Sequence, residues 1–230
     1  MNVLITGASR GIGLEFVRYG IERGWRLFAC CRHPQQADSL INTATLAKGQ
    51  VSVHVADMDE LATVQALAYE LRNEPIDLLI NNAGTYGPQD MRFGRVDTDA
   101  WLQAFSVNTI APLKVVESFI ENLHMGQSPT VACLSSKMGS MADNGSGGSY
   151  VYRSSKAALN AVIKSMAVDL GEQGIKVVAL HPGWVRTEMG GPDAEITPRQ
   201  SVTAMVSILE GLSAADSGRF IDIDGSDIPW

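Results

Sequence analysis

The chain has 230 residues, of which 45% are hydrophobic and 19% are charged. This composition suits a folded protein with a buried core and excludes disorder as a global description. Lys and Arg number 18 against 25 Asp and Glu, so the formal net charge is −7, and no run of basic residues occurs. We therefore expect neither nucleic acid nor an anionic membrane surface as a partner.

The three cysteines are too few and too unevenly spaced for a disulfide framework, since Cys30 and Cys31 are adjacent and Cys133 is far away. We expect a reduced, cytoplasmic protein. No apolar run is long enough to predict a membrane span, and the first residues lack the pattern of a secretion signal. The four histidines lie far apart, and none stands at metal-ligand spacing from a Cys or a carboxylate, so no metal site is expected.

Short apolar segments alternate with segments of helical period along the whole chain, which predicts β-α units and a parallel sheet. The candidate strands are residues 2–6, 26–31, 51–56, 76–81, 130–134, 176–181 and 219–222. The candidate helices are residues 11–23, 35–47, 60–72, 98–122, 150–171 and 198–212. Because the strands are apolar without strict alternation, we expect an α/β fold: one doubly wound parallel sheet with helices on both faces, in a single domain over residues 1–230.

Two stretches, 143–149 and 190–198, are rich in Gly, Ser or Pro and have no apolar period. Both follow predicted strands. Open parallel sheets bind ligands at the carboxyl ends of their strands, so we expect these loops to meet a substrate.

The first predicted strand runs directly into Gly7-Ala8-Ser9-Arg10-Gly11-Ile12-Gly13, after which a helix begins. Glycines allow a tight turn here and let a phosphate approach the helix N-terminus, where free N–H groups and the helix dipole favour an anion. The spacing G-x-x-x-G-x-G differs from the common G-x-G-x-x-G pattern. Simple chain reversal is the alternative, but the place after the first strand favours a dinucleotide site.

The end of the second predicted strand carries Arg32 where an acidic residue would bind a ribose 2′-hydroxyl. Together with Arg10 in the glycine turn, it offers guanidinium groups that suit a 2′-phosphate. We therefore expect NADP rather than NAD. The alternative is that both arginines are ordinary solvated side chains.

Tyr152 and Lys156 are four residues apart in an amphipathic helical segment and so share one face. An ammonium held near a phenol stabilises the phenolate, and we expect it to lower the pKa of Tyr152. Taken alone, such a pair is usually no more than two surface neighbours.

Further motifs accompany this pair: Thr6-Gly7-x-x-x-Gly11-x-Gly13, Asn81-Asn82-Ala83-Gly84, Asn108, Ser135-Ser136-x-x-Gly139 and His181-Pro182-Gly183. In order and approximate spacing, the set resembles the short-chain dehydrogenase/reductase family over the whole chain. Three finer stretches resemble its C-factor-like and carbonyl-reductase branch: 150–160, Pro182-Gly183-Trp184-Val185-x-Thr187 and Asp224-Gly225-x-x-Ile228-Pro229-Trp230.

The resemblance implies a Rossmann-type fold and NADPH-dependent reduction of an aldehyde or ketone. It implies that Tyr152 donates a proton to the carbonyl oxygen and that Ser136 hydrogen-bonds this oxygen. It further implies that Lys156 binds the nicotinamide ribose and that Asn108 anchors a relay water. The implied cofactor-binding residues, besides Tyr152 and Lys156, are Gly7, Ser9, Arg10, Gly11, Ile12, Gly13, Arg32, Asp57, Met58, Asn82, Ala83, Gly84, Pro182, Gly183, Val185 and Thr187.

Among these, Asp57 is implied to meet the adenine, and Val185 and Thr187 the carboxamide. Alternatives stay open at two positions: Asn108 as a structural polar group within a helix, and Asp57 as a turn or cap residue. Ser136 is chosen over Ser135 on the family pattern, because adjacent strand residues face opposite ways.

The sequence predicts an enzyme that acts on a small carbonyl compound. A dinucleotide-binding signalling or sensor protein with incidental catalysis is the alternative, and epimerisation of a sugar nucleotide is disfavoured by the short C-terminal part. The helical segments 98–122 and 150–171 resemble those that pair subunits in the family, so a homodimer is expected as an alternative to a monomer. We expect residues 186–200 to form a mobile lid over the site. The alternative is a rigid loop or a helical turn near residues 194–196.

Overall fold

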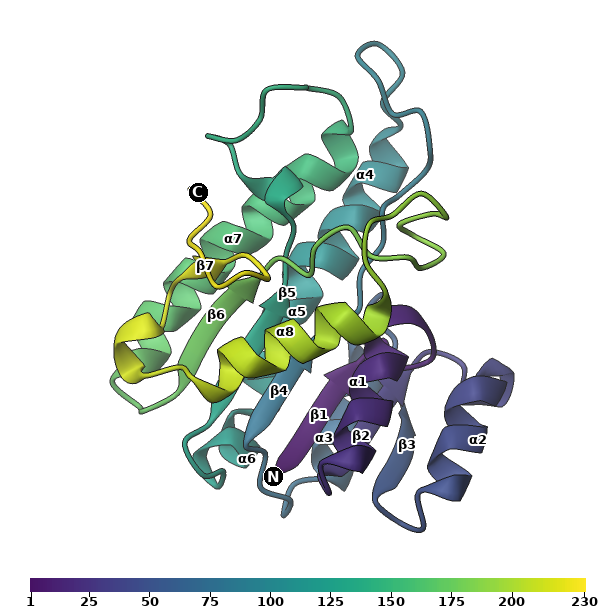
Figure 1. Ribbon diagram of the computed structural model, residues 1–230, viewed down its shortest axis with the longest axis vertical. Helices are drawn as coiled ribbons and strands as arrows, with labels where there is room; N and C mark the ends of the chain where they lie inside the picture. Colours follow the sequence, from purple (N-terminus) through teal and green to yellow (C-terminus); the bar gives the residue numbers. More distant parts are fainter.

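The computed structural model describes residues 1–230 and contains one sheet of seven parallel strands (Figure 1). The strands are β1 (Asn2–Thr6), β2 (Arg26–Cys31), β3 (Val51–Val55), β4 (Leu78–Asn81), β5 (Thr130–Leu134), β6 (Lys176–Leu180) and β7 (Phe220–Ile221). Their spatial order is β3-β2-β1-β4-β5-β6-β7, so the sheet is doubly wound as expected. The order of strands reverses between β1 and β4, and the carboxyl ends of these two strands therefore border the crevice in which such sheets bind ligands.

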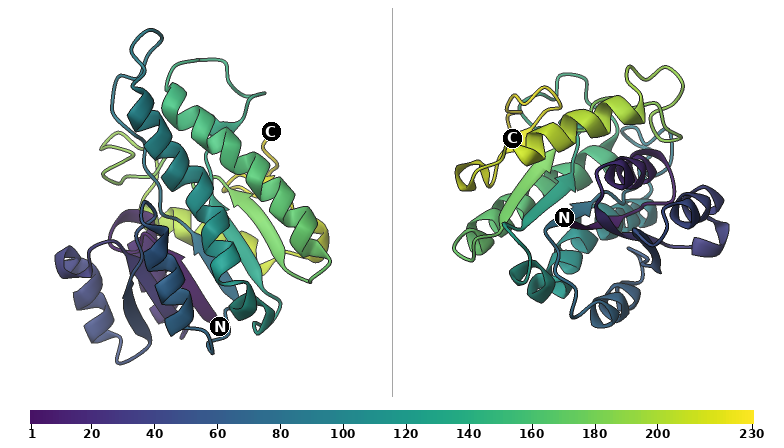
Figure 2. Two further views of the ribbon diagram at one scale, coloured as in Figure 1. Left: turned by 180° about the vertical axis from the view of Figure 1, so that it is seen from behind. Right: turned by 60° about the horizontal axis from the view of Figure 1, so that its bottom comes forward.

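The helices are α1 (Gly11–Glu22), α2 (Asp38–Leu46), α3 (Leu61–Glu70), α4 (Thr98–Phe105), α5 (Ala111–Ser118), α6 (Ile120–His124), α7 (Tyr150–Gly171) and α8 (Pro198–Glu210). One face of the sheet is covered by α1, α2 and α8, and the other by α3, α5 and α7 (Figure 1). Figure 2 shows α4 and α5 following one another alongside α7 on the second face. No helix combines the length and the apolar character that crossing a membrane requires.

Each layer of helices packs on its own hydrophobic core, and the strands supply side chains to both. In β5, Val131 and Cys133 belong to the core under α3, α5 and α7, whereas Ala132 and Leu134 belong to the other core. Successive side chains of a strand point to opposite faces, so both sets must be apolar. This is why the strands are continuous apolar runs in the sequence.

The three cysteines are free and buried, and they are divided between the two cores. Cys30 and Cys133 lie under α3, α5 and α7, and Cys31 lies under α1, α2 and α8. Burial raises the pKa of all three thiols, that of Cys133 to about 11. The thiols are therefore protonated and shielded in the folded protein.

The predicted elements agree with the structure to within a few residues at their ends, with one exception. The expected continuous helix over residues 98–122 is wrong, because a π-helical turn at Ser106–Ile110 separates α4 from α5, and Phe119 separates α5 from α6. Pro112 has no N–H and cannot donate to the carbonyl of Asn108, as an α-helix would require. The backbone instead widens, and the Ala111 amide bonds the Ser106 carbonyl five residues back.

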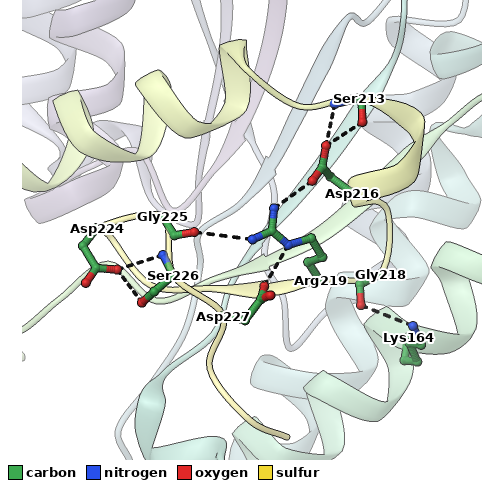
Figure 3. Close-up of polar contacts among 9 residues, drawn as sticks. All are labelled: Lys164, Ser213, Asp216, Gly218, Arg219, Asp224, Gly225, Ser226 and Asp227. Atoms are coloured by element: carbon green, nitrogen blue, oxygen red, sulfur yellow. Dashed lines mark hydrogen bonds and ion pairs between the residues drawn. The ribbon is translucent and has the colours of Figure 1, made fainter.

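The segment after α8 is fastened by Arg219 (Figure 3). Its guanidinium donates to Asp216 Oδ1 at 2.7 Å, to Asp227 Oδ1 at 2.8 Å and to the Gly225 carbonyl at 3.4 Å. Lys164 of α7 donates to the Gly218 carbonyl at 3.4 Å, beside this cluster. These contacts fix the turns on both sides of β7 against the body of the protein.

The last residues of the chain then lie against the loop that follows β5. The Ser140 hydroxyl donates to the Pro229 carbonyl, and the Ala142 amide donates to the Trp230 carbonyl at 3.2 Å. The Trp230 ring stacks on Phe220 with centroids 5.4 Å apart. The end of the chain thus supports a loop at the carboxyl edge of the sheet.

Candidate active site

The glycine turn between β1 and α1 is compact because of the residues at its two ends. Gly7 has a φ of +66°, and a Cβ added to Gly13 would lie 2.2 Å from the Gly7 carbonyl oxygen, which is too close for any side chain. Asn82, at the exit of β4, donates from Nδ2 to the carbonyls of Thr6 and Gly7 at 2.8 and 3.0 Å. The turn is therefore held against the neighbouring strand across the crevice.

The first turn of α1 fits a phosphate group. Its N-cap residue, Arg10, makes no side-chain capping bond, so no side chain competes with an anion for the amides of that turn. The helix dipole adds to the attraction. The residues at this position fit the diphosphate of a dinucleotide, whereas no group of His, Cys, Asp and Glu side chains is arranged to hold a metal ion.

The two arginines expected near a 2′-phosphate differ in their surroundings. Arg32 is exposed and makes no hydrogen bond or ion pair within the chain. Arg10 lies 3.0 Å from Glu188, with both side chains about three-quarters exposed. An exposed pair of this kind contributes about 1 kcal/mol or less, so Arg10 can exchange its carboxylate for a phosphate at little cost.

At the end of β3, Asp57 and Met58 have mainly structural contacts. The Asp57 carboxylate accepts from the Asp59 amide at 3.0 Å, and the backbone amide of Asp57 donates to Thr63 Oγ1 at 2.8 Å. Met58 is 6% exposed and packs in the core. The contacts of Asp57 are therefore those of a turn residue. The side chain of Met58 is buried, so only its backbone is available to a ligand.

Asn108 lies in the π-helical turn and is fully buried. Its Oδ1 accepts from the Thr85 amide at 2.8 Å, and its Nδ2 donates to the Thr85 carbonyl at 2.8 Å and to Ser155 Oγ at 2.9 Å. Both hydrogens of Nδ2 and one lone pair of Oδ1 are therefore used within the protein.

The two adjacent serines after β5 have different contacts. The Ser135 hydroxyl is bonded to Asn160 Oδ1 of α7 at 2.5 Å. Ser136 Oγ accepts from the Met138 amide at 3.1 Å and lines the same cleft as Tyr152, whose pKa it tends to lower. Of the two, only Ser136 places its hydroxyl beside the tyrosine.

Lys156 lies behind Tyr152 on the same helix and is 5% exposed. Its Nζ donates to the Leu134 carbonyl at 2.7 Å and lies 5.9 Å from the centroid of the Tyr152 ring. A Cβ on Gly139 would meet the Lys156 backbone at 2.9 Å, so this glycine lets the turn after Ser136 pack directly on α7. Ser136, Tyr152 and Lys156 are thereby brought together.

The expected lowering of the Tyr152 pKa is wrong for the protein without a ligand. Burial raises the pKa of Tyr152 to about 12, although the hydroxyl of Ser136 acts in the opposite direction. Burial also lowers the pKa of Lys156 to about 8. Loss of hydration disfavours the charged form of each group and here outweighs any effect of the ammonium on the phenol. At neutral pH the phenol keeps its proton.

A cleft of about 950 Å³ opens at the carboxyl edge of the sheet beside these groups. Its walls include Ile12 of the glycine turn, Ser136, Tyr152 and Thr187. Both irregular stretches identified in the sequence contribute to it: Asp143, Gly145 and Ser146 from the first, and Gly190 and Gly191 from the second. These two loops therefore lie where a substrate would bind.

Of the expected lid over residues 186–200, residues 186–197 form an irregular loop with defined contacts at its base, whereas residues 198–200 are the first turn of α8. The Arg186 amide bonds the Ile196 carbonyl at 2.8 Å, and the Ile196 amide bonds the Trp184 carbonyl at 3.2 Å. The Thr187 side chain lies against Gly11 of the glycine turn. No helical turn forms at residues 194–196, and Val185 instead forms a parallel bridge with Ile196. Movement of this segment stays a prediction.

Sequence reasoning missed two residues of the cleft. Arg153 donates to Ser146 Oγ at 2.7 Å and to the carbonyls of Gly147 and Met138, both at 3.2 Å, and so fastens the glycine-rich loop. Tyr86 stacks on Tyr152 with ring centroids 4.6 Å apart. Arg153 directly follows the tyrosine of the motif, but nothing in the sequence indicates that Tyr86 reaches that tyrosine.

Comparisons with known proteins agree with this arrangement. The model of the short chain dehydrogenase family matches residues 1–196. The chain is 43% identical over 167 residues to C-signal of Myxococcus xanthus, which covers 73% of this chain and all of that protein.

Two solved structures are similar over the whole chain. The NADPH-bound carbonyl reductase from chicken fatty liver has a TM-score of 0.92 and 33% identity, with 100% of this chain and 98% of that chain covered. The carbonyl reductase Sniffer of D. melanogaster has a TM-score of 0.93 and 30% identity, with 100% and 99% covered. The chain belongs to the short-chain dehydrogenase/reductase family of oxidoreductases, and its relatives support the C-factor-like and carbonyl-reductase branch.

Proposed function

We propose that the protein reduces a small aldehyde or ketone to an alcohol with NADPH. The observation that carries this proposal is that Ser136 and Tyr152 line one cleft beside the glycine turn, with the Lys156 ammonium buried 5.9 Å from the centroid of the Tyr152 ring. NADP as the cofactor is supported by Arg32, which has no partner in the chain, and by the NADPH-bound relative. The bound dinucleotide supplies the hydride, and the protein supplies position and proton transfer.

In the proposed reaction, Tyr152 donates its phenolic proton to the carbonyl oxygen. The raised pKa of Tyr152, about 12, keeps this proton in place at neutral pH. As the carbonyl becomes an alkoxide, the oxygen becomes a stronger base than a phenolate, so the transfer is favourable even from a weak acid. Ser136 hydrogen-bonds the same oxygen and stabilises the charge that develops on it.

Lys156 has two roles in this proposal. Its ammonium stabilises the phenolate that remains after proton transfer, and it is oriented by the Leu134 carbonyl at 2.7 Å. It is also placed to bind the ribose next to the nicotinamide. Asn108 supports the site indirectly, because it holds the Thr85 backbone at the edge of the cleft.

The test is NADPH oxidation with a panel of aldehydes and diketones, measured on the wild type, Tyr152→Phe and Tyr150→Phe. Tyr150 lies on the same helix, is 39% exposed and has Ser154 rather than a lysine four residues on, so it is the matched control. We expect Tyr152→Phe to lose nearly all turnover with little change in NADPH affinity, and Tyr150→Phe to retain it. Retained turnover in Tyr152→Phe would contradict the assignment.

The similarity to C-signal favours a second candidate, a dinucleotide-binding signalling protein whose catalysis is incidental. The two candidates differ in the panel assay. A signalling protein of this kind binds NADPH but turns over none of the carbonyl compounds appreciably, whereas a reductase turns over at least one.

We also propose that residues 1–230 act as one domain. The sequence leaves a homodimer and a monomer open; a homodimer would pair the outer faces of α4 and α7, where Leu102 and Val168 are 65% and 67% exposed. Sedimentation of the wild type and of a Val168→Glu variant tests it. A monomer in both samples contradicts the dimer.

A further inference from the structure

The segment that follows β4 passes over Tyr152 on a rigid support. Asn108 binds both backbone groups of Thr85, each at 2.8 Å, and is itself fully buried. The next residue is Tyr86, and Gly87 beyond it has a φ of +77° with Val151 3.1 Å from the place of a Cβ. The backbone on both sides of Tyr86 is thus closely fitted to the protein.

The Tyr86 side chain makes two contacts across the cleft. Its ring stacks on that of Tyr152, with centroids 4.6 Å apart and an angle of 27° between the planes. Its hydroxyl lies 2.9 Å from Ser149 Oγ, so it also joins the segment after β4 to the glycine-rich loop before α7. One side chain therefore restrains the proposed proton donor and links two loops of the cleft.

Ser149 is in a conformation that its own local preferences disfavour. It has a φ of +45° in the left-handed region, directly after Gly147 and Gly148, which are also left-handed. A left-handed residue with a side chain costs about 1 kcal/mol or more. Ser149 is also the N-cap of α7, yet its hydroxyl makes no capping bond and instead contacts Tyr86. The Ser149 hydroxyl therefore bonds Tyr86 in place of capping the first turn of α7.

A second cavity, of about 450 Å³, adjoins the main cleft. Tyr86, Gln89 and Tyr152 line both cavities. The remaining walls of the second cavity come from Pro88, Asp90, Met91, Arg92, Gly148, Ser149 and Val151. Gln89 is exposed at the rim, whereas Tyr86 is stacked on the proposed donor. Tyr86 therefore borders both spaces beside Tyr152.

We propose that Tyr86 determines substrate size: its ring, held by Tyr152 and Ser149, closes the main cleft toward the second cavity and excludes bulky groups there. A carbonyl compound with small alkyl substituents fits beside Tyr152 in the presence of this ring. A compound with an aryl group on each side of the carbonyl needs the second cavity as well. This inference rests on the proposed function, because it places the carbonyl at Tyr152.

The test compares 2,3-butanedione with benzil, two diketones that differ in the size of their substituents. We expect Tyr86→Ala to raise the ratio of kcat/KM for benzil to that for 2,3-butanedione by at least about tenfold. Tyr86→Phe keeps the ring and should leave the ratio unchanged. Both substrates use the same donor, so a loss of Tyr152 positioning lowers both values together and cancels in the ratio. Tyr150→Ala, on the helix that carries Tyr152, is the matched control, since it removes a tyrosine ring that lines neither cavity.

Calorimetric titration with benzil gives a second readout that needs no turnover. We expect Tyr86→Ala to bind benzil about fivefold more tightly than the wild type or Tyr86→Phe. The inference is overturned if Tyr86→Ala unfolds at the same temperature as the wild type and changes neither the kcat/KM ratio nor the affinity for benzil. If the wild type binds NADPH but reduces neither these diketones nor any other compound of the panel, the proposed function fails, and the titration alone then decides whether Tyr86 limits the size of a bound compound.

Discussion

Lys156→Met is expected to stabilise the protein in the absence of dinucleotide, because the wild type buries an ammonium. Burial lowers the pKa of Lys156 from its ordinary 10.5 to about 8, a difference that corresponds to about 3 kcal/mol at neutral pH. Methionine has a similar shape and no charge, but it loses the bond to the Leu134 carbonyl, which is worth about 1 kcal/mol. The free energy of unfolding should therefore rise by about 2 kcal/mol at neutral pH.

The pH dependence identifies the cause. Below about pH 8 the ammonium is charged in both the folded and the unfolded protein, and the full cost is present. Between about 8 and 10.5 the unfolded chain still binds a proton that the folded protein has released, so the wild type gains stability relative to the variant. The raised pKa values of Tyr152 and the cysteines destabilise both proteins alike at high pH and cancel in the difference.

The measurement is urea unfolding of both proteins at several pH values in this range. Lys164→Met, on the exposed side of the same helix, gives the baseline for loss of an exposed ammonium with one long hydrogen bond, to the Gly218 carbonyl at 3.4 Å. A difference between the wild type and Lys156→Met that stays constant with pH would refute the reasoning, as would a variant that is less stable than the wild type at neutral pH.

Four further predictions concern the dinucleotide. Gly13→Ala should abolish NADPH binding in a titration while the chain stays folded, since its Cβ would lie 2.2 Å from a carbonyl oxygen of the turn; unchanged affinity contradicts this. Arg32→Ala should lower the preference for NADPH over NADH, measured as a kcat/KM ratio, by about ten- to a hundredfold. Glu188→Gln removes the carboxylate that pairs with Arg10 and should raise the affinity for NADPH slightly. NADPH should slow tryptic cleavage after Arg186 and Arg199, mapped by mass, and equal rates with and without it mean that the cofactor does not order this segment.

Much of the fold could be predicted because its causes are local or periodic. The buried strands show as apolar runs, and the glycine turn shows by its spacing and its place after the first strand. Tyr152 and Lys156 share a face because the helical period requires it. The π-helical turn was missed because the helical period over residues 98–122 predicts a helix but does not show how its backbone adapts to Pro112 in its interior.

The rest of the site depends on contacts that the sequence does not reveal. The pKa of Tyr152 is set by how deeply tertiary packing buries it, and a spacing of four residues carries no information on burial. Tyr86 and Ser149 are 63 positions apart, and each looks like an ordinary loop residue. Glu188 was not foreseen as a partner of Arg10, because the path of the loop after β6 brings them together.

Because the cysteines are divided between the two cores, their labelling can show which layer of helices separates from the sheet during partial unfolding. A thiol reagent reaches Cys31 only when the layer of α1, α2 and α8 separates from the sheet, and reaches Cys30 or Cys133 only when the opposite layer does. Mass spectrometry of briefly labelled samples therefore shows which layer opens first, without any substitution. Equal labelling of all three thiols would indicate that the two layers come away from the sheet in one cooperative event.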